Sequence, residues 1–462
     1  MPQANARRKK IGPLKKIGLR LVDGVSRSLD SVVTRQLIAH ASRNGADSPF
    51  RREEVRSILV FDVWAIGDMI LSSPLLRELR LSFPGAHITL VAQHYTLALF
   101  EHCPYVDEVL PLDVGALNLL SSSWAECLKG YVFASRLLQK RDFDLAVGIH
   151  WCTDLWVQSS VVYFSQARWR IGFCQNAYVS EYKASECDVF YTNIIDSEVV
   201  LHEVERKLKV IEALGGAPSS DALEIWTDTK DEQYAEALVS IGSKKQLLVG
   251  MGVGTAKPGK QWPTERYAQL AEWLIDEHDA IIVVVGNEKE RSFANAVAHR
   301  RPGHVINAAG TTTILQCAAL LKRCALYIGN DTSTKHMAAA AGVPVVEVSA
   351  EAAFRPDGSP ASSKLVARWY PWRTRHRIVQ PHALSEPCRT KNGFGDFVFC
   401  AFDEAHCILA VSVDEVKDAV TSLMEECQLV PRPRPQQADA RPVQQFNSRY
   451  GAPPVITAAC RR

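Results

Sequence analysis

A chain of 462 residues is long enough for two domains, since a single domain commonly holds roughly 100 to 200 residues. Its 47% hydrophobic and 23% charged residues are typical of a globular protein and exclude wholesale disorder, collagen and coiled coil. Cysteine accounts for 12 residues with no CxxC pair, so neither a disulfide framework nor a zinc ribbon is expected. A reducing, cytoplasmic compartment fits this cysteine usage.

The net charge of +2 is unevenly distributed. Residues 1–45 hold ten Lys or Arg against two Asp, a net of +8, and residues 431–462 hold six Arg against one Asp, a net of +5. The remaining body therefore carries −11. Nucleic acids are bound by clustered basic residues, so an acidic body argues against a nucleic-acid partner, while the basic ends are expected to meet something anionic.

The two ends of the chain differ from its body. Apolar and basic residues interleave in residues 1–45, which either lie on an anionic membrane surface or form a solvated basic tail. Six prolines and no periodicity predict a disordered tail at 431–462. No apolar run is long enough to span a membrane, because the nearest candidate, residues 57–76, contains Asp62 and Asp68.

Strands and helices alternate along the body of the chain. In the first half, strands are predicted at 57–63, 87–92 and 144–149 and helices at 69–83 and 201–215. In the second half, strands are predicted at 246–254, 280–286, 325–329 and 343–349 and helices at 264–278, 289–301, 312–324, 334–342 and 413–427. Continuous Val and Ile runs are what a parallel sheet covered by helices requires.

We therefore expect an α/β protein with two doubly wound, Rossmann-like domains in tandem. Ligands of such folds bind at the carboxyl ends of the strands and in the cleft between the domains. The predicted divisions are a basic extension at 1–54, an N-terminal Rossmann-like domain at 55–232, a C-terminal Rossmann-like domain at 233–430 and the tail at 431–462.

The loop after the strand at 246–254 has features of a phosphate site. Its sequence GTAKPGK matches the start of a P-loop, but Gln261 replaces the Ser or Thr that holds magnesium, which argues against an NTPase. Thr255, Lys257 and Lys260 offer a hydroxyl and positive charge just before a helix whose amino end attracts anions. The alternative is a solvated surface loop. An incomplete GxGxxG also argues against a dinucleotide-dependent oxidoreductase.

A second polar loop follows the strand at 325–329. Asp331, Thr332 and Ser333 are all of the residue types that cap helices, and they are more than the start of one helix needs. Taken alone, the loop is better explained as a cap. Opposite a Lys-Gly phosphate loop, it predicts a split nucleotide-sugar site in which Asp331 accepts hydrogen bonds from sugar hydroxyls. His336, in the following helix, either packs against this loop or contacts the donor.

Two carboxylates follow predicted strands. Asp68 is either the N-cap of the first helix or a general base that faces the cleft. Glu288 occupies the strand-end position at which a carboxylate binds ribose hydroxyls in nucleotide folds, or it is a solvated acid. Cys388, Cys400, His406 and Cys407 are too loosely spaced for a typical zinc site and are interpreted mainly as structural, with metal binding as the minor alternative.

Several of these segments, in order, resemble the landmarks of glycosyltransferase family 9, the heptosyltransferases of lipopolysaccharide synthesis. They are ILVFDVWAIGDMILSSPLLRELRLSFPGAHITLVA, RWRIGF, HEVERKLKVIEALG, GTAKPGKQWP and GNDTSTKHMAAAAGVPVV, and they span roughly residues 57–428. The resemblance implies a GT-B fold and metal-independent, inverting transfer from a nucleotide-activated sugar, with no cofactor. It also implies that the domain at 55–232 binds the acceptor and the domain at 233–430 the nucleotide-sugar donor. The implied donor is ADP-linked, such as ADP-heptose, and the implied acceptor is a lipopolysaccharide-core or related membrane-linked saccharide.

The resemblance also implies roles for individual residues. It makes Asp68 the base and places Lys260 with Thr255, and Asp331 with Thr332, at the donor. Two departures stand out: Asp62-Val63 lies where an Arg is common, and Ser333-Thr334-Lys335 replaces a Gly-containing stretch. The predicted function is thus a glycosyltransferase of the cytoplasm or the inner membrane face. The alternative is a non-catalytic nucleotide-sugar-binding or scaffold protein on the same fold.

Overall fold

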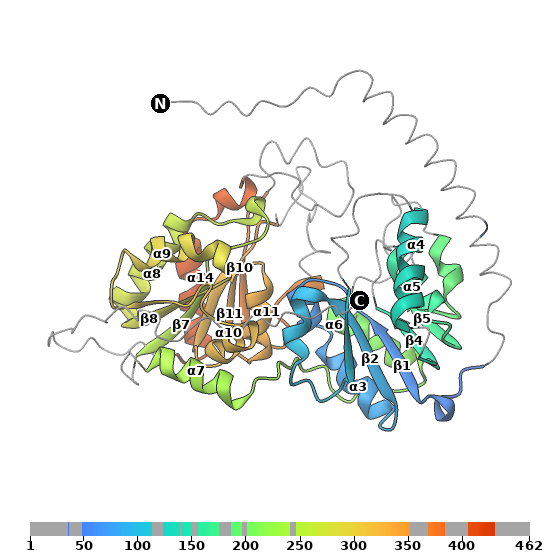
Figure 1. Ribbon diagram of the computed structural model, residues 1–462. Helices are drawn as coiled ribbons and strands as arrows, with labels where there is room; N and C mark the ends of the chain where they lie inside the picture. Colours follow the sequence, from blue (N-terminus) through green and yellow to red (C-terminus); the bar gives the residue numbers. More distant parts are fainter. Residues whose placement is uncertain are drawn as a thin grey trace, which may run out of the picture.

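Two lobes, each built on a parallel sheet, make up the computed structural model (Figure 1). It describes residues 49–112, 123–138, 141–149, 156–174, 186–195, 201–240, 246–351, 368–383 and 405–429, together with Gln36. The predictions for the basic extension up to residue 48, apart from Gln36, for the tail and for Cys388 and Cys400 lie outside these residues.

The first lobe contains a six-stranded sheet in the order β3-β2-β1-β4-β5-β6, with every strand pair parallel. Its strands are β1 (Ser57–Phe61), β2 (His87–Gln93), β3 (Glu108–Leu112), β4 (Leu145–Gly148), β5 (Trp169–Phe173) and β6 (Asn193–Ile195). Its helices are α2 (Ile66–Ile70), α3 (Ser73–Ser82), α4 (Ser123–Phe133), α5 (Trp156–Phe164) and α6 (Glu203–Ala213), with the short helix η2 (His94–Phe100) after β2.

The second lobe repeats this plan in the order β12-β11-β10-β7-β8-β9, again with parallel pairs only. Its strands are β7 (Leu247–Gly252), β8 (Ala280–Val285), β9 (Val305–Asn307), β10 (Leu326–Asn330), β11 (Val345–Val348) and β12 (His376–Val379). Its helices are α7 (Thr229–Val239), α8 (Thr264–His278), α9 (Arg291–Ala298), α10 (Ile314–Leu321), α11 (Ser333–Ala340) and α14 (Val413–Glu426), with short helices η6 (Pro258–Lys260), η7 (Glu288–Glu290) and η8 (Cys407–Ala410). The predicted tandem of doubly wound domains is confirmed.

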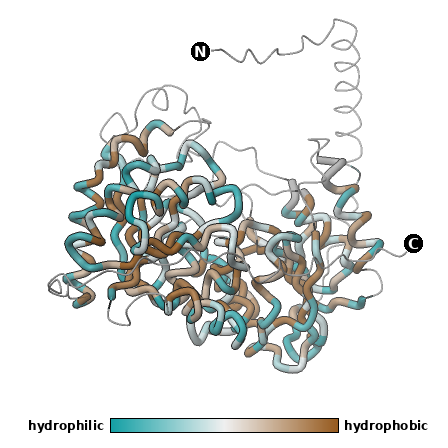
Figure 2. Tube along the Cα trace, turned by 60° about the vertical axis from the view of Figure 1, so that its left-hand side comes forward, coloured by the Kyte–Doolittle hydropathy of each residue, from teal (hydrophilic) through white to brown (hydrophobic). Residues whose placement is uncertain are grey.

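Successive side chains of a strand point to opposite faces of the sheet, so the apolar residues form separate layers. In β1, Ile58 and Val60 enter a cluster that extends into the second lobe, whereas Leu59 and Phe61 enter a cluster on the opposite face of the first sheet. A third cluster covers the outer face of the second sheet, beneath α8 and α14. Hydrophobic segments accordingly run through the interior of both lobes (Figure 2).

Two predicted limits differ from the structure. The helix predicted at 69–83 is two helices, α2 and α3, because Pro74 at the start of α3 cannot continue a helix from the preceding turn. The division predicted between residues 232 and 233 falls inside α7, which packs against α10 of the second lobe. Among the described residues, no helix is long and apolar enough to cross a membrane.

Candidate active site

A cavity of about 1060 Å³ lies between the two lobes. Its walls come from the segment after β1 and from α6 in the first lobe, and from the segments after β7, β8, β10 and β11 in the second. The site is therefore at the carboxyl ends of both sheets, where ligands of doubly wound folds bind.

Asp68 reaches this cavity from the first turn of α2. The N-cap of this helix is Ala65, so the predicted capping role for Asp68 is wrong. Instead, the Oδ1 atom of Asp68 accepts a hydrogen bond of 3.1 Å from the indole Nε1 of Trp369. Burial raises the pKa of Asp68 to about 6, an effect that the nearby ammonium of Lys207 partly offsets. A carboxylate tuned in this way suits proton transfer near neutral pH.

A buried polar group supports the backbone beneath Asp68. The Nζ atom of Lys207 donates to the backbone carbonyl of Asp68 and to the Oγ atom of Ser72, each at 2.7 Å. Ser72 in turn donates to the carboxylate of Asp62, which is fully buried. Burial raises the pKa of Asp62, while Lys207 lowers it. Asp62, whose Oδ2 atom lies 3.9 Å from the Nζ atom of Lys207, thus serves as the counter-charge of Lys207.

The two donor loops predicted from sequence lie together. Asn330, at the end of β10, accepts a hydrogen bond of 3.1 Å from the backbone N–H of Trp262 and donates to the carbonyl of Val253 at 3.4 Å. These bonds fix the loop after β7 against the loop after β10. Lys260 from the first loop then meets Asp331 from the second, with Nζ 2.7 Å from Oδ2.

Further charged side chains of both signs lie next to the Lys260–Asp331 pair. Lys260 also lies 3.7 Å from Glu351, and the ammonium of Lys335 contacts both Asp331 and Glu347. Burial alone would raise the pKa of Asp331, but the two lysines hold it well below its ordinary range. Burial raises the pKa of Glu351 to about 7. Lys335 therefore favours the ionised form of Asp331 independently of Lys260.

The start of α11 supplies the remaining predicted donor residues. Thr332 and Ser333 line the cavity, as does His336, whose pKa burial holds well below its ordinary value. The His336 ring is therefore neutral, and its Nδ1 atom is buried with no hydrogen-bond partner among the described residues. A Cβ atom on Gly67 would lie 2.9 Å from this ring, so glycine is what lets α2 and α11 approach across the cleft.

Glu288 is not part of the cavity wall. Its side chain is 67% exposed and pairs with Arg291 of the same helical segment, at 3.1 Å. Glu290, two residues further on, lines the cavity instead and lies beside Gly254, where a Cβ atom would collide with it. The sequence signal placed a carboxylate after β8 but could not distinguish which of two acids in one short helix faces inward.

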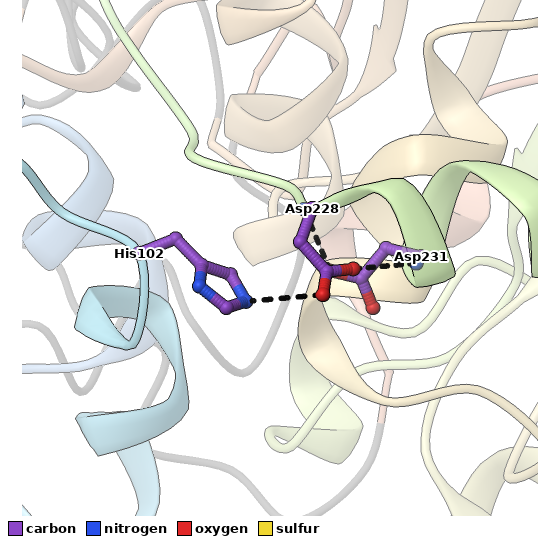
Figure 3. A group of neighbouring side chains, drawn as sticks. All are labelled: His102, Asp228 and Asp231. Carbon is purple, nitrogen blue, oxygen red and sulfur yellow. Dashed lines mark hydrogen bonds and ion pairs between the residues drawn. The ribbon is translucent and has the colours of Figure 1, made fainter.

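A histidine and two aspartates lie together outside the cavity (Figure 3). Asp228 and Asp231 form the capping box of α7, in which each carboxylate accepts the other residue's backbone N–H. His102 lies 3.8 Å from Asp228. Because the carboxylates already serve the helix start, this group is explained as a helix cap with an ion-pair contact from the first lobe.

The family described as glycosyltransferase family 9 (heptosyltransferase) matches residues 134–390, which is more than half of the chain. The chain belongs to glycosyltransferase family 9. It is therefore a glycosyltransferase. The lipooligosaccharide heptosyltransferase 2 of Haemophilus ducreyi is 24% identical over 322 residues, covering 66% of this chain and 86% of that protein.

Solved structures share the fold of this glycosyltransferase. The family 9 glycosyl transferase of Veillonella parvula superposes with a TM-score of 0.60 at 20% identity, covering 80% of this chain and 97% of that one. The ADP-heptose lps heptosyltransferase II of E. coli gives a TM-score of 0.56 at 19% identity, covering 81% and 99%. The two facing Rossmann-like lobes are thus a GT-B fold, as expected.

The cavity of this glycosyltransferase contains most of the predicted site residues and some that were not predicted. Those brought together are Asp68, Thr255, Lys260, Asp331, Thr332, Ser333 and His336. Those that the sequence did not single out are Lys207, Glu290, Glu351 and Trp369. A motif could have pointed to Lys207, which lies in the HEVERK segment, but no motif contains Trp369.

Proposed function

We propose that the protein is an inverting heptosyltransferase that moves heptose from ADP-heptose to a lipopolysaccharide-core or related saccharide, with Asp68 as general base. The Haemophilus ducreyi relative is named a lipooligosaccharide heptosyltransferase, and the E. coli structure an ADP-heptose lps heptosyltransferase. The observation that carries the proposal is that Asp68 of the first lobe and the Lys260–Asp331 pair of the second line the same cavity.

In this mechanism an acceptor hydroxyl attacks the anomeric carbon of the donor. The new bond from the acceptor oxygen to the anomeric carbon forms as the bond to the diphosphate oxygen breaks, and the hydroxyl proton passes to the Asp68 carboxylate. Such general base catalysis is commonly worth 10²- to 10⁴-fold. The nucleoside diphosphate leaves with the electron pair of the broken bond, and its charge is stabilised by Lys260.

The donor contacts follow from the geometry of the second lobe. Lys260 exchanges part of its bonding to Asp331 for the donor diphosphate, and Thr255 and the amino end of α11 supply a hydroxyl and backbone N–H groups. The freed Asp331 carboxylate then accepts from sugar hydroxyls. Glu290, rather than Glu288, is the strand-end carboxylate placed to bind ribose hydroxyls. With Lys260 and Lys335 as the cations, transfer proceeds without a metal ion.

The location of the reaction remains a prediction. The charge of residues 1–45 favours contact with an anionic membrane surface at the cytoplasmic face, where a membrane-linked acceptor would be found. We also retain the prediction that the first lobe binds the acceptor and the second the donor.

The experiment that tests the proposal replaces Asp68 by Asn and measures donor binding and sugar transfer separately. Asn keeps the size of the side chain and an oxygen that can accept from Trp369, so folding and donor affinity should be retained. Turnover should fall at least 100-fold, because the amide cannot take the proton. Asp228→Asn, which alters a carboxylate outside the cavity and keeps a good helix cap, is the matched control.

Two outcomes would contradict the proposal. Near-normal turnover in Asp68→Asn would remove Asp68 as the base. A wild-type protein that binds ADP-heptose but releases no ADP in the presence of acceptor would instead support the non-catalytic binding protein.

A further inference from the structure

A short segment of the second half of the chain lies against the first lobe. We call residues 368–373 the crossing segment, because it lies between β11 and β12 in sequence although both strands belong to the second sheet. It contacts the first lobe and the linker between the lobes. Arg368 forms an ion pair with Glu203, Trp369 donates a hydrogen bond to Asp68, and the backbone carbonyl of Tyr370 contacts the ring of His202. Trp372 and Arg373 both bind Asp221.

In the contact between Trp369 and Asp68, the indole can only donate the hydrogen bond. An indole N–H can donate but has no acceptor atom, so it favours the ionised form of the carboxylate that it meets. Burial raises the pKa of Asp68, and the bond from Trp369 is one of the effects that lower it. The bond engages Oδ1, while Oδ2 has no hydrogen-bond partner in the part of the chain that the structure describes.

Trp369 is itself held in place by its neighbour. The guanidinium of Arg368 lies 4.0 Å from the centroid of the indole ring, and its Nε and Nη2 atoms donate to Glu203 at 2.8 and 2.6 Å. Both members of this ion pair are almost fully buried. Stacking on a fixed cation leaves the indole few other orientations, so the position of its N–H is determined by the packing of α6.

We propose that Trp369 is a positioning residue for the catalytic base. Its N–H holds Oδ1 of Asp68, so that Oδ2 is the oxygen that receives the acceptor proton, and the crossing segment makes this orientation depend on the contact between the lobes. This assignment rests on the proposed role of Asp68. It extends that role by naming a residue 301 positions away in sequence that sets the rotamer and the proton affinity of the base.

The test is Trp369→Phe, which keeps an aromatic ring beside Arg368 but removes the N–H donor together with part of the ring volume. We expect turnover to fall about tenfold, as for the loss of one hydrogen bond to a charged group. The KM for the donor should stay unchanged, because Trp369 is placed at the base and not at the diphosphate. The acid limb of the pH–rate profile should move to higher pH, since the ionised carboxylate loses a stabilising donor.

Trp372→Phe is the matched control within the same segment. It removes an indole N–H that donates to the backbone carbonyl of Asp221 at 2.9 Å, outside the cavity. This variant should keep the wild-type acid limb and turnover. Trp369→Tyr, which returns an O–H donor to the ring, should recover part of the turnover lost in Trp369→Phe.

The outcomes separate this inference from the proposed function. Wild-type turnover and an unmoved acid limb in Trp369→Phe would overturn the positioning role while leaving Asp68 as the base. If Trp369→Phe and Trp372→Phe lose the same turnover and the acid limb does not move, the crossing segment is only structural. This result would also overturn the positioning role. Activity in Asp68→Asn would instead overturn the proposed function. Thermal unfolding of each variant distinguishes these results from misfolding.

Discussion

Asp68 is the residue whose surroundings are most closely matched to a chemical task. Burial opposes its charge, Lys207 and Trp369 favour it, and the result is a pKa of about 6. An ordinary Asp, with a pKa near 4, would be a weaker base at neutral pH. The same burial costs stability, so the position is better explained by function than by folding.

The pKa of Asp68 leads to a prediction about pH. The base must be ionised to accept a proton, so kcat/KM should be constant above pH 6 and fall about tenfold per pH unit below it. Measuring initial rates of transfer from pH 4.5 to 8 at low substrate checks this. Glu351, with a pKa of about 7, also lines the cavity. The fall of kcat/KM below pH 6 should therefore still be seen in Glu351→Gln, because Asp68 rather than Glu351 causes it. A fall that begins only near pH 4 in the wild-type protein would contradict the prediction.

Lys260 leads to a second prediction at this scale. In the proposed mechanism, Lys260→Ala removes a charge-assisted bond to the donor diphosphate, and such a bond is worth about 1.5 to 3 kcal/mol. The dissociation constant of ADP-heptose should rise roughly tenfold to a hundredfold, measurable by calorimetric titration. Lys335 still neutralises Asp331 in this variant, so the protein should fold. Unchanged donor affinity would place the diphosphate elsewhere in the cavity.

The elements of the second lobe were the easiest to predict from sequence. The helix expected at 264–278 has the same limits as α8, and the expected strand at 280–286 contains β8, because long periodic runs and buried Val-Ile runs are strong signals. The short edge strands β6, β9 and β12 were not predicted, since three or four residues carry too little pattern. The five-residue strands β3 and β5 and the helices α4, α5 and α7 were missed as well. The sequence also located two loops that meet at the cavity, because glycine, lysine and hydroxyl residues cluster in them where strands end.

Gly67 gives a prediction at the scale of two helices. In Gly67→Ala the new Cβ would lie 2.9 Å from the buried ring of His336 and 3.5 Å from the Cα of Ser333. α2 must then move away from α11 and take Asp68 with it. We expect turnover to fall at least tenfold, since displacement of a catalytic group by about 1 Å can cost 100-fold. The transfer assay together with a thermal unfolding curve measures this effect.

Gly85→Ala is the control for this substitution. Gly85 lies in the turn before β2, and a Cβ atom there would meet nothing within 4 Å. The control should keep the wild-type turnover. If Gly67→Ala does the same, the close approach of α2 and α11 has no role in placing the base.

At the scale of the whole molecule, the sequence could predict two lobes and a cleft but not how they are joined. The crossing segment bonds to Asp68, Glu203 and His202, and none of these contacts has a periodicity or spacing that a sequence reveals. Such contacts depend on where the fold brings distant segments, which is why Trp369 was missed. The buried ion pair of Glu203 and Arg368 is an example, because it can be recognised only once the structure shows the two side chains together.

The apolar cluster that contains Ile58 and Val60 also contains Val283 and Tyr327 of the second sheet. Unfolding one lobe alone would expose the other lobe's share of this cluster to water, at about 25 cal/mol per Å² of apolar surface. The lobes should therefore melt together, as a single endotherm in scanning calorimetry with a van't Hoff enthalpy close to the calorimetric one. Two resolved endotherms would show instead that each half is thermodynamically independent. Joint melting would make a destabilising substitution in either half lower the melting temperature of both.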